Sequence, residues 1–235
     1  MQTGNSMKLT NFTEKTVDMP KLQSMCLRDT VNNAYVCTPR IDDELRWVFT
    51  EESEAIEKLD GTNTSITVKN GQIIAINNRL NPVIWWKKGS KRFIEGITEA
   101  IEKEYIKIEE LEDGQYFGEL IGPSVNANPY QLDKHLWLPF AFMREHLRYK
   151  FWDDFVKELK GLSDEEILAK TSELFKTLWS LYKRRRGIKG EVDENTVFTG
   201  MAAEGIVFYA KNTNEMAKLR RDMFDWFIAN QVNTK

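Results

Sequence analysis

The segment Lys58–Asn63 (Lys-Leu-Asp-Gly-Thr-Asn) combines the residue types that covalent catalysis by an amine requires. It follows one apolar run and precedes another, so we expect Lys58 at the end of a strand. At that place Gly61 would let a nucleotide approach the backbone, and the lysine could act as a nucleophile. Because a free lysine has a pKa of about 10.4, such a site has to lower it through burial or neighbouring cations. The competing interpretation is a solvated turn that contains a surface lysine.

Three further segments follow in order: Gly118–Gly122 (Gly-Glu-Leu-Ile-Gly), Glu204–Phe208 (Glu-Gly-Ile-Val-Phe) and Lys218–Arg220 (Lys-Leu-Arg). With Lys58–Asn63, this set resembles the covalent nucleotidyltransferase superfamily, which comprises polynucleotide ligases and mRNA capping enzymes. The Lys-x-Asp-Gly-Thr-Asn form and the Gly-Glu-Leu-Ile-Gly-Pro segment look most like RNA ligases of the small phage and bacterial type (RNA ligase 2-like). The resemblance spans roughly 45–225. Any one motif is weak, whereas the four together are specific.

The resemblance implies an ATP-dependent RNA ligase that works through a covalent lysyl-AMP intermediate. Lys58 would attack the α-phosphorus of ATP, AMP would pass to a 5′-phosphate, and a 3′-hydroxyl would then seal the strand. The cofactors would be ATP and Mg²⁺ or Mn²⁺, the metal being held by oxygen ligands and phosphates. Three alternatives stay open: a GTP-dependent capping guanylyltransferase, an ATP-dependent DNA ligase, and a non-catalytic nucleotide-binding module.

The same resemblance places other members of the lysine segment at the nucleotide. Glu57, Asp60 and Gly61 would belong to the nucleotide-binding loop, with Asp60 orienting the loop or the lysine. Asn63 would help to hold a hydrated metal. The alternative for Asn63 is an ordinary turn residue that hydrogen-bonds its own backbone.

Two carboxylates are expected to complete the acidic part of the site. Glu119, flanked by Phe117 and Leu120, would accept hydrogen bonds from the ribose hydroxyls. Glu204, at the entry to an apolar run, would coordinate the divalent metal. A glutamate on the solvent face of a strand is the alternative for Glu119.

Three cations are expected to contact phosphate. Arg79 follows the second strand of a predicted hairpin, and its planar guanidinium suits an oxyanion. Lys218 and Arg220 alternate with apolar residues, so they share one face if 216–222 is a strand. From that face they would stabilise the charge that develops at the α-phosphate. The alternative for this stretch is an amphipathic helix, which would remove the assignment of Lys218.

An aromatic ring is expected to stack on adenine, and the resemblance takes it from the segment after Glu119. Phe140 is the better match and Trp137 is its rival, although either could be a core residue. Between them and Glu119, residues 122–130 resemble a glycine-rich loop of some phage RNA ligases. Ser124 and Ala127 occupy positions where that pattern has glycines, which puts a direct polynucleotide role of this loop in doubt.

The composition is that of a globular protein without a global positive field. The 235 residues are 41% hydrophobic, contain seven tryptophans and carry a net charge of −3. Nucleic-acid contacts must therefore come from local basic patches. Two stretches qualify: Trp85–Arg92, which interleaves rings with cations in a way that suits stacking and phosphate contact, and Lys183–Arg186, whose cations would also complement a helix C-terminus.

Cys26 and Cys37 are the only cysteines. Their spacing argues against a zinc site, and we expect reduced thiols rather than a disulfide framework. No apolar run is long enough to span a membrane, and residues 1–7 read as a leader or disordered segment without a signal sequence. These observations predict a cytoplasmic protein (in the host cytoplasm if phage-encoded) that does not bind membranes.

The periodicity predicts an α+β fold, an adenylation domain of twisted antiparallel sheets around a cleft, formed by one domain over 8–235. Strands are expected at 34–36, 47–49, 65–68, 72–76, 115–121, 135–142 and 205–210, with a hairpin turn at Asn70-Gly71, a helix over 92–104 and a helical insert at about 145–186. Only about fifteen residues follow the last motif. The insert or a partner protein would therefore help to bind the RNA (possibly DNA) ends or nicks.

Overall fold

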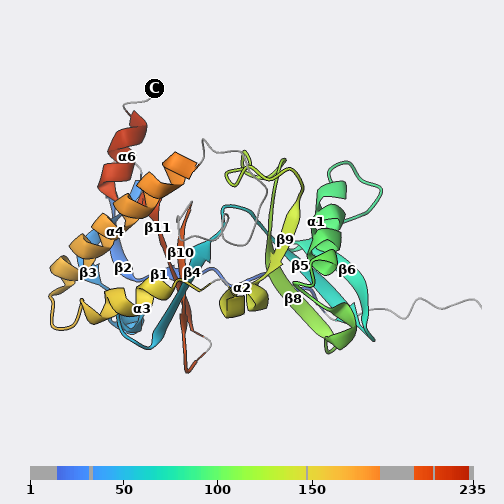
Figure 1. Ribbon diagram of the computed structural model, residues 1–235, viewed down its shortest axis with the longest axis horizontal. Coiled ribbons are helices and arrows are strands. Elements are labelled where there is room, and N and C mark those ends of the chain that lie inside the picture. The colour runs from blue at the N-terminus through green and yellow to red at the C-terminus, as the bar shows by residue number, and fades with distance from the viewer. Residues whose placement is uncertain (1–14, 32–33, 147, 186–203, 214, 233–235) are drawn as a thin grey trace, which may run out of the picture.

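The computed structural model describes residues 15–31, 34–146, 148–185, 204–213 and 215–232. Two main sheets lie next to each other, and helices cover their outer sides (Figure 1). The predicted α+β class is confirmed. The predicted leader at 1–7 and the side chains of the basic stretch Lys183–Arg186 lie outside the described part of the chain.

The first main sheet has the strand order β1–β11–β10–β4. Its strands are β1 (Gln23–Ser24), β11 (Met216–Arg220), β10 (Gly205–Ala210) and β4 (Ser53–Lys58). β10 is antiparallel to both neighbours, and only the short β1–β11 pair is parallel. The strand predicted at 205–210 is confirmed. Residues 216–220 also form a strand, in which Ala217 and Leu219 are fully buried while Met216, Lys218 and Arg220 are half-buried. The helical alternative is wrong.

The second main sheet has the order β7–β6–β5–β8–β9. Its strands are β7 (Asn81–Pro82), β6 (Gln72–Asn78), β5 (Thr62–Lys69), β8 (Gly114–Ile121) and β9 (Leu136–Pro139). Asn70 and Gly71 both have positive φ, +49° and +68°, which is what a two-residue hairpin turn that matches strand twist demands. The predicted hairpin is confirmed. Because β4 runs into β5 through residues 59–61, the two sheets are joined at the lysine segment.

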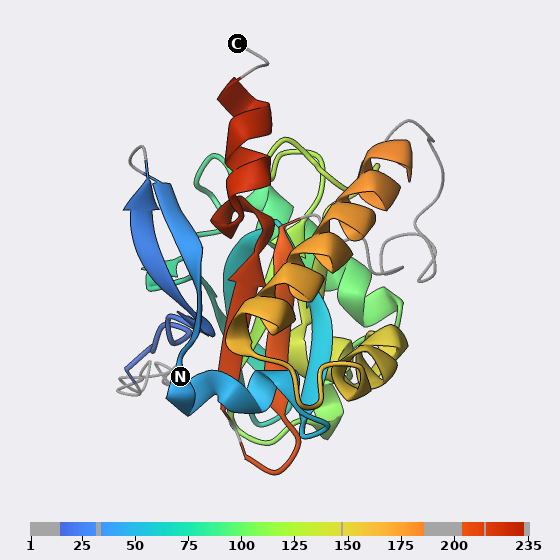
Figure 2. The ribbon, with the colours of Figure 1, turned by 90° about the vertical axis from the view of Figure 1, so that its left-hand side faces the viewer.

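Helix α1 (Lys91–Glu102) covers the second sheet and buries Phe93, Ile97 and Ala100 against it, as its spacing predicts. Helices α3 (Lys150–Lys157) and α4 (Asp164–Arg185) pack on the first sheet (Figure 2). The helical insert is therefore confirmed over these two spans. α4 begins with reciprocal hydrogen bonds between Ser163 and Glu166, in which each backbone N–H donates to the other's side chain.

Two predicted strands are wrong in whole or in part. Residues 47–49 end a 3₁₀ helix, η1 (Asp43–Phe49), which is capped by Asp42; a run of three apolar residues does not distinguish strand from helix. In the span 135–142, only β9 is a strand. Helix α2 (Phe140–His146) starts directly after Pro139, which has no N–H to extend the ladder.

A small two-stranded sheet of β2 (Cys26–Val31) and β3 (Ala34–Ile41) contradicts the expectation of two free thiols. Cys26 and Cys37 form a disulfide bond across this pair, with their Cα atoms 5.5 Å apart. The antiparallel pairing, with a register shift between Cys26 and Arg28, brings the two residues together. Sequence separation alone does not reveal such a register.

The remaining described helices are short: η2 (Ile108–Glu110), η3 (Arg221–Met223) and α6 (Asp225–Val232). None of the described helices combines the length and the apolarity needed to cross a membrane. One core cluster packs α3, α4 and η1 on the first sheet, another packs α1 on the second, and a third bridges the two sheets. The bridging cluster lies under the predicted site and contains Ile56, Leu59, Ile121, Leu138 and Met143.

Candidate active site

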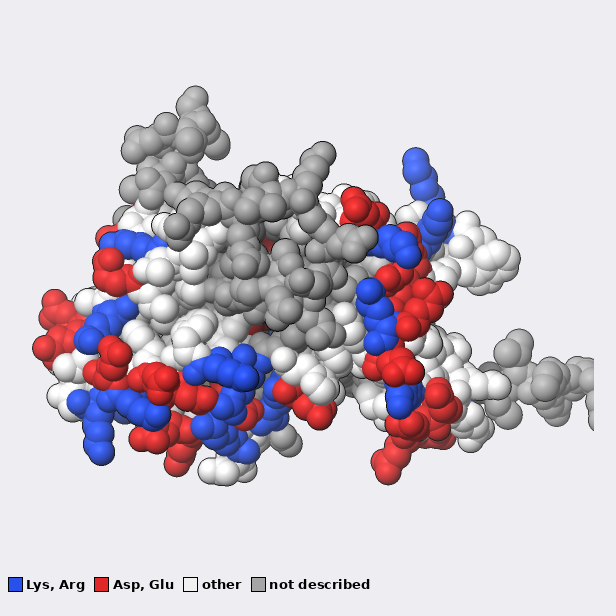
Figure 3. Space-filling model, in the orientation of Figure 1, with Lys and Arg blue, Asp and Glu red and all other residues white. Residues whose placement is uncertain are grey.

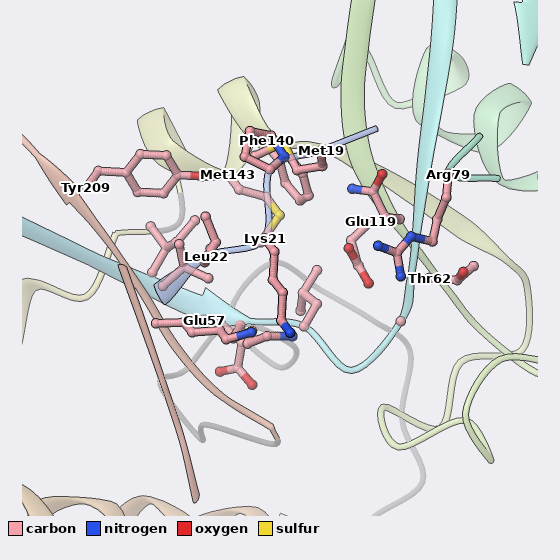
Figure 4. A pocket seen from close by; sticks show the side chains of 18 of the residues that line it. Met19, Lys21, Leu22, Glu57, Thr62, Arg79, Glu119, Phe140, Met143 and Tyr209 are labelled. Carbon is pink, nitrogen blue, oxygen red and sulfur yellow. The ribbon is translucent and has the colours of Figure 1, made fainter. Parts of the chain in front are cut away.

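A pocket of about 540 Å³ opens where the two main sheets meet. In Figure 4, Arg79, Glu119 and Thr62 stand on one side of it, and Leu22 and Tyr209 stand on the other. Phe140, Met143 and Met19 lie together at one end. The predicted site residues that line the pocket are Glu57, Lys58, Gly61, Asn63, Arg79, Glu119, Phe140 and Lys218. The predicted cleft is thus present, and most of the predicted residues meet in it.

Lys58 is the last residue of β4, and the strand register explains its neighbours. It pairs with Gly205 of β10, which in turn pairs with Arg220 of β11. Lys218 lies one alternation further along β11, so it shares a face with Lys58 and Arg220. The Nζ of Lys58 lies 2.5 Å from Oε2 of Glu204, the residue directly before β10. This ion pair places the predicted nucleophile beside the predicted metal ligand.

Glu204 also faces Arg220, whose NH1 lies 4.0 Å from its Oε1. Burial, then the charges of Arg220 and Lys58, lower the pKa of Lys218. Arg220 also pairs with Asp222 at 3.1 Å, so the end of the first sheet holds three cations and two carboxylates. An anion that enters here would meet excess positive charge in a partly desolvated setting, where electrostatic attraction is strong.

Gly61 has to be a glycine because the second sheet passes very close to it. A Cβ atom at this position would lie 2.5 Å from the carbonyl oxygen of Leu120 and 2.7 Å from Cγ of Glu119. The backbone of Gly61 also hydrogen-bonds the Glu119 carboxylate. The close approach thus couples the lysine segment directly to Glu119.

Asp60 holds the segment in place rather than lining the pocket. Its carboxylate accepts a hydrogen bond of 2.8 Å from Nδ2 of Asn126, which also donates to the carbonyl of Gly61 at 2.7 Å. Its backbone N–H donates to the hydroxyl of Tyr130 at 2.8 Å. Residues 122–130, which resemble a glycine-rich loop, therefore brace the lysine segment from behind. The sequence pattern did not indicate this contact.

Asn63 and Glu119 are cross-strand partners on β5 and β8, so their side chains share a face. Oδ1 of Asn63 is buried and accepts no hydrogen bond from any described residue. A buried acceptor without a donor is costly unless a ligand satisfies it. Glu119 lies beside it, and desolvation by the pocket walls raises the pKa of Glu119 to about 8, against an opposing effect of Lys58.

The raised pKa of Glu119 predicts a specific pH dependence of stability. Because the folded protein keeps a proton that the unfolded chain releases near pH 4.5, the free energy of unfolding falls as the pH rises from about 4.5 to about 8. Glu119→Gln removes this loss, so the variant gains stability relative to the wild type between pH 5 and pH 8. Urea unfolding at both pH values measures the difference. The exposed Glu109→Gln variant is the control, and an equal gain in it, or none in Glu119→Gln, contradicts the prediction.

Arg79 lies at the pocket edge in a strained backbone conformation, with φ of +54°. Its backbone N–H donates to the carbonyl of Asn63 at 3.1 Å, which ties it to the site. Its guanidinium forms two hydrogen bonds with Oδ2 of Asp18, at 2.9 and 3.1 Å. The side chain is 64% exposed, so an incoming phosphate can compete for it.

The structure separates the two candidate aromatic residues. Trp137 is fully buried and its Nε1 donates to the carbonyl of Thr64, which makes it part of the core. Phe140 lines the pocket from the first turn of α2. Of the two, only Phe140 is available to a bound base. Its assignment to a strand was wrong, and its base-stacking role stays a prediction.

Glu57 is a predicted site residue whose carboxylate bonds to a buried tyrosine. It alternates with Lys58 along β4, is almost fully buried, and accepts a hydrogen bond from the hydroxyl of Tyr149 before α3. Its place on the strand brings it to the pocket margin. Its nucleotide-binding role stays a prediction.

The segment Asp18–Leu22 forms part of the pocket and was missed by the sequence analysis. Lys21 extends into the space between the two sides of the pocket (Figure 4), and its charge contributes to lowering the pKa of Lys218. The segment is held to the second sheet through Val17, which exchanges hydrogen bonds with Gln115. A short irregular stretch ahead of the first strand has no periodicity that could have revealed this contact.

Comparison with known proteins identifies the class to which this fold and site belong. The model of the RNA ligase family matches residues 51–224, three quarters of the chain. The protein therefore belongs to the RNA ligase family. No curated protein sequence gives a significant match.

Similar solved structures come from Naegleria gruberi RNA ligase. A mutant of it with AMP and Mn is 14% identical with a TM-score of 0.45, covering 91% of this chain and 60% of that one. A mutant with ATP and Mn gives the same four values. The form with PPi is 14% identical with a TM-score of 0.43, covering 99% of this chain and 64% of that one. The chain thus spans about 60% of the length of these proteins.

Proposed function

We propose that this protein is an ATP-dependent RNA ligase that adenylates itself on Lys58. The observation that carries the proposal is the position of the Lys58 amine, at the end of β4, in a pocket that also contains Glu119, Lys218 and Phe140. Family membership supplies the class of reaction. The pocket supplies an amine, cations for phosphates, a carboxylate for a sugar and a ring for a base.

The proposed reaction has three steps, each of which exchanges one phosphorus–oxygen or phosphorus–nitrogen bond for another. Nζ of Lys58, after losing a proton, attacks the α-phosphorus of ATP, and the bond to the leaving pyrophosphate breaks. An oxygen of an RNA 5′-phosphate then displaces Lys58 from the AMP phosphorus. Finally a 3′-hydroxyl attacks the activated 5′-phosphate and releases AMP. Covalent catalysis of this kind divides one difficult transfer into easier ones.

The residues on the two sides of the pocket bind different parts of the nucleotide. Phe140 packs against the base, and Glu119 contacts the ribose; the raised pKa of Glu119 leaves it a proton to donate near neutral pH. Lys218, Arg220 and Lys21 stabilise negative charge on the phosphates as pyrophosphate departs. Arg79 exchanges Asp18 for a phosphate, either of the nucleotide or of the RNA end.

The residues present fit a divalent cation held mainly by its substrate. The described part of the chain has no cluster of three or more His, Cys, Asp or Glu side chains that could form a metal cage. Asn63, whose Oδ1 is unsatisfied, lines the pocket, and Glu204 lies beside the pocket residue Lys58. Both offer oxygen ligands, which suits Mg²⁺ or Mn²⁺ bound through one or two protein ligands and phosphates. When bound, such an ion would neutralise phosphate charge.

The test is nucleotide-specific labelling of the protein. With α-labelled ATP and Mg²⁺ or Mn²⁺, we expect a label that survives denaturation and that pyrophosphate removes by reversing the first step. Labelled GTP is not expected to react. Labelling from GTP alone would instead indicate a guanylyltransferase, and binding of ATP without covalent transfer would indicate a non-catalytic module. Comparing nicked RNA with nicked DNA then identifies the polynucleotide.

A further inference from the structure

The segment Trp85–Arg92 presents an unusual combination of exposed rings and cations. It joins β7 to α1 at the right-hand end of the molecule in Figure 1. Trp85 is 73% exposed and Trp86 is 70% exposed, and their rings meet edge to face with centroids 5.4 Å apart. Two large exposed rings gain nothing from burial on folding, and adjacent exposed apolar groups of this kind mark interaction sites. The proposed reaction does not use either ring.

The charge in this segment is entirely positive. Lys87, Lys88, Lys91 and Arg92 occur within eight residues that contain no acid. None of the three lysines forms an ion pair with a described residue. Figure 3 shows Lys and Arg side chains projecting at this upper right corner. Because the whole chain carries a net charge of −3, the patch is a local feature rather than part of a general excess.

Two of these cations lie where a helix disfavours them. Lys91 and Arg92 occupy the first turn of α1, and no acidic residue is present in that turn. A helix N-terminus carries partial positive charge, so cations there are destabilising and an anion is stabilising. Binding of a polyanion would offset this unfavourable interaction between the cations and the helix N-terminus. The rings therefore indicate a ligand that covers apolar surface, and the charges indicate that this ligand is a polyanion.

Hydrogen bonds hold the segment Trp85–Arg92 in a defined turn. The backbone N–H of Lys87 donates to the carbonyl of Ile84 at 2.8 Å, and the N–H of Ser90 donates to that of Lys87 at 3.2 Å. The hydroxyl of Ser90 donates to the same Ile84 carbonyl at 2.7 Å, instead of capping the helix. These bonds hold the turn that carries the rings. Ordering before binding reduces the entropic cost of association.

The segment is connected to the pocket by a short path. Arg79, at the pocket edge, precedes Trp85 by six residues, so their Cα atoms are at most roughly 20 Å apart. Strand β7, which pairs with β6, and a hydrogen bond of 2.8 Å from Val83 to Ile76 fix the chain between them. At about 3.4 Å per nucleotide in a stacked strand, that path corresponds to roughly six nucleotides. A strand whose end lies at Arg79 can therefore reach the rings.

We infer that Trp85–Arg92 is a docking platform for single-stranded RNA, on which bases stack against the two tryptophans while the lysines contact phosphates. Base stacking on aromatic rings tolerates any sequence, and cations beside it follow the backbone. Exposed rings beside lysines without ion pairs favour a polynucleotide over a protein partner. The buried core of a protein–protein interface is depleted of charged residues, whereas this segment concentrates charge of one sign. The inference rests on the proposed function in one respect only, namely that the reacting end of the RNA lies at the pocket.

The test measures RNA binding and self-adenylation separately in the full chain. A 5′-phosphorylated single-stranded RNA of twelve nucleotides with a fluorescent label reports binding by anisotropy. We expect Trp85→Ala/Trp86→Ala to weaken binding by roughly five- to hundredfold, while nucleotide labelling on Lys58 remains at the wild-type level. Tyr35→Ala, which removes a ring that is 62% exposed on the two-stranded sheet, is the matched control and should bind as the wild type does.

Salt and length dependence identify which groups touch the RNA. In Lys87→Gln/Lys88→Gln, the slope of log affinity against log salt should become shallower by about 0.7 for each phosphate that a lysine no longer neutralises. With 5′-phosphorylated RNAs of increasing length, the tryptophan substitutions should weaken binding by the time the RNA reaches roughly six nucleotides, the greatest span that the chain between Arg79 and Trp85 allows. Binding of the twelve-nucleotide RNA that is unchanged in both double variants overturns the inference, even if labelling succeeds. Failure of labelling in the wild type defeats the proposed function and leaves the binding comparison valid.

Discussion

Lys58→Ala is expected to abolish covalent labelling by ATP, lowering it by at least about 10³-fold and to background, because the substitution removes the proposed nucleophile. Lys58→Arg should be equally inactive, since a guanidinium stays protonated and cannot attack phosphorus. The amine lies 2.5 Å from the Glu204 carboxylate, so the arginine variant also keeps the ion pair. Loss of labelling in both variants therefore separates nucleophilic chemistry from a purely structural role of the charge.

The controls for this experiment are other lysines. Lys218→Ala should retain a labelled adduct that forms more slowly, because the role proposed for Lys218 is to stabilise phosphate charge without bonding to phosphorus. The exposed Lys160→Ala should label as the wild type does. Each variant is first compared by thermal unfolding, so that a loss of fold is not read as a loss of chemistry. A stable adduct in Lys58→Ala would show that the reactive group lies elsewhere.

The convergence of Lys58, Glu119, Glu204 and Lys218 was implied by the resemblance of their four motifs to one family, whereas the position of each residue at or beside a strand follows from the local pattern. Strand alternation then determines which side chains share a face, as with Lys218 and Arg220. The hairpin at Asn70-Gly71 was predictable for a similarly local reason, the positive φ that the turn requires. Information of this kind is contained within a few consecutive residues.

What could not be anticipated depends on contacts between distant segments. The approach of Asp18 to Arg79 and of Tyr130 to Asp60 joins residues 61 and 70 positions apart. Neither contact has a periodic signature. The Cys26–Cys37 disulfide was missed because it depends on the register of a strand pair. The raised pKa of Glu119 arises from burial between two sheets, and a strand pattern alone does not specify that burial.

The sheet junction also explains how so many charged side chains come together at the site. Residues 59–61 cross from one sheet to the other above an apolar cluster, which holds both sheets in place. The cations belong to the first sheet, whereas Glu119 and Asn63 belong to the second. Neither sheet alone could build the pocket. The geometry of the site therefore depends on how the two sheets are joined, and Gly61 lies in close contact with the second sheet at this junction.

Gly61→Ala is accordingly expected to have the second largest effect. The new Cβ atom would lie 2.5 Å from the Leu120 carbonyl and 2.7 Å from Cγ of Glu119, so the sheets must move apart or the lysine segment must shift. Overpacking of this kind costs about 1–3 kcal/mol of stability. A displacement of about 1 Å of the reacting groups can cost about 10²-fold in rate, so labelling should fall far more than stability does.

Gly114→Ala is the matched control because it lies on the same strand as Glu119 and its Cβ would meet only Tyr116, at 3.8 Å. We expect it to retain full labelling and nearly full stability in urea unfolding. If Gly61→Ala labels as fast as Gly114→Ala, the lysine segment is free to move without harm to the chemistry. In that case the close contact between the sheets would serve folding alone, and the coupling of Lys58 to Glu119 through Gly61 would have to be abandoned.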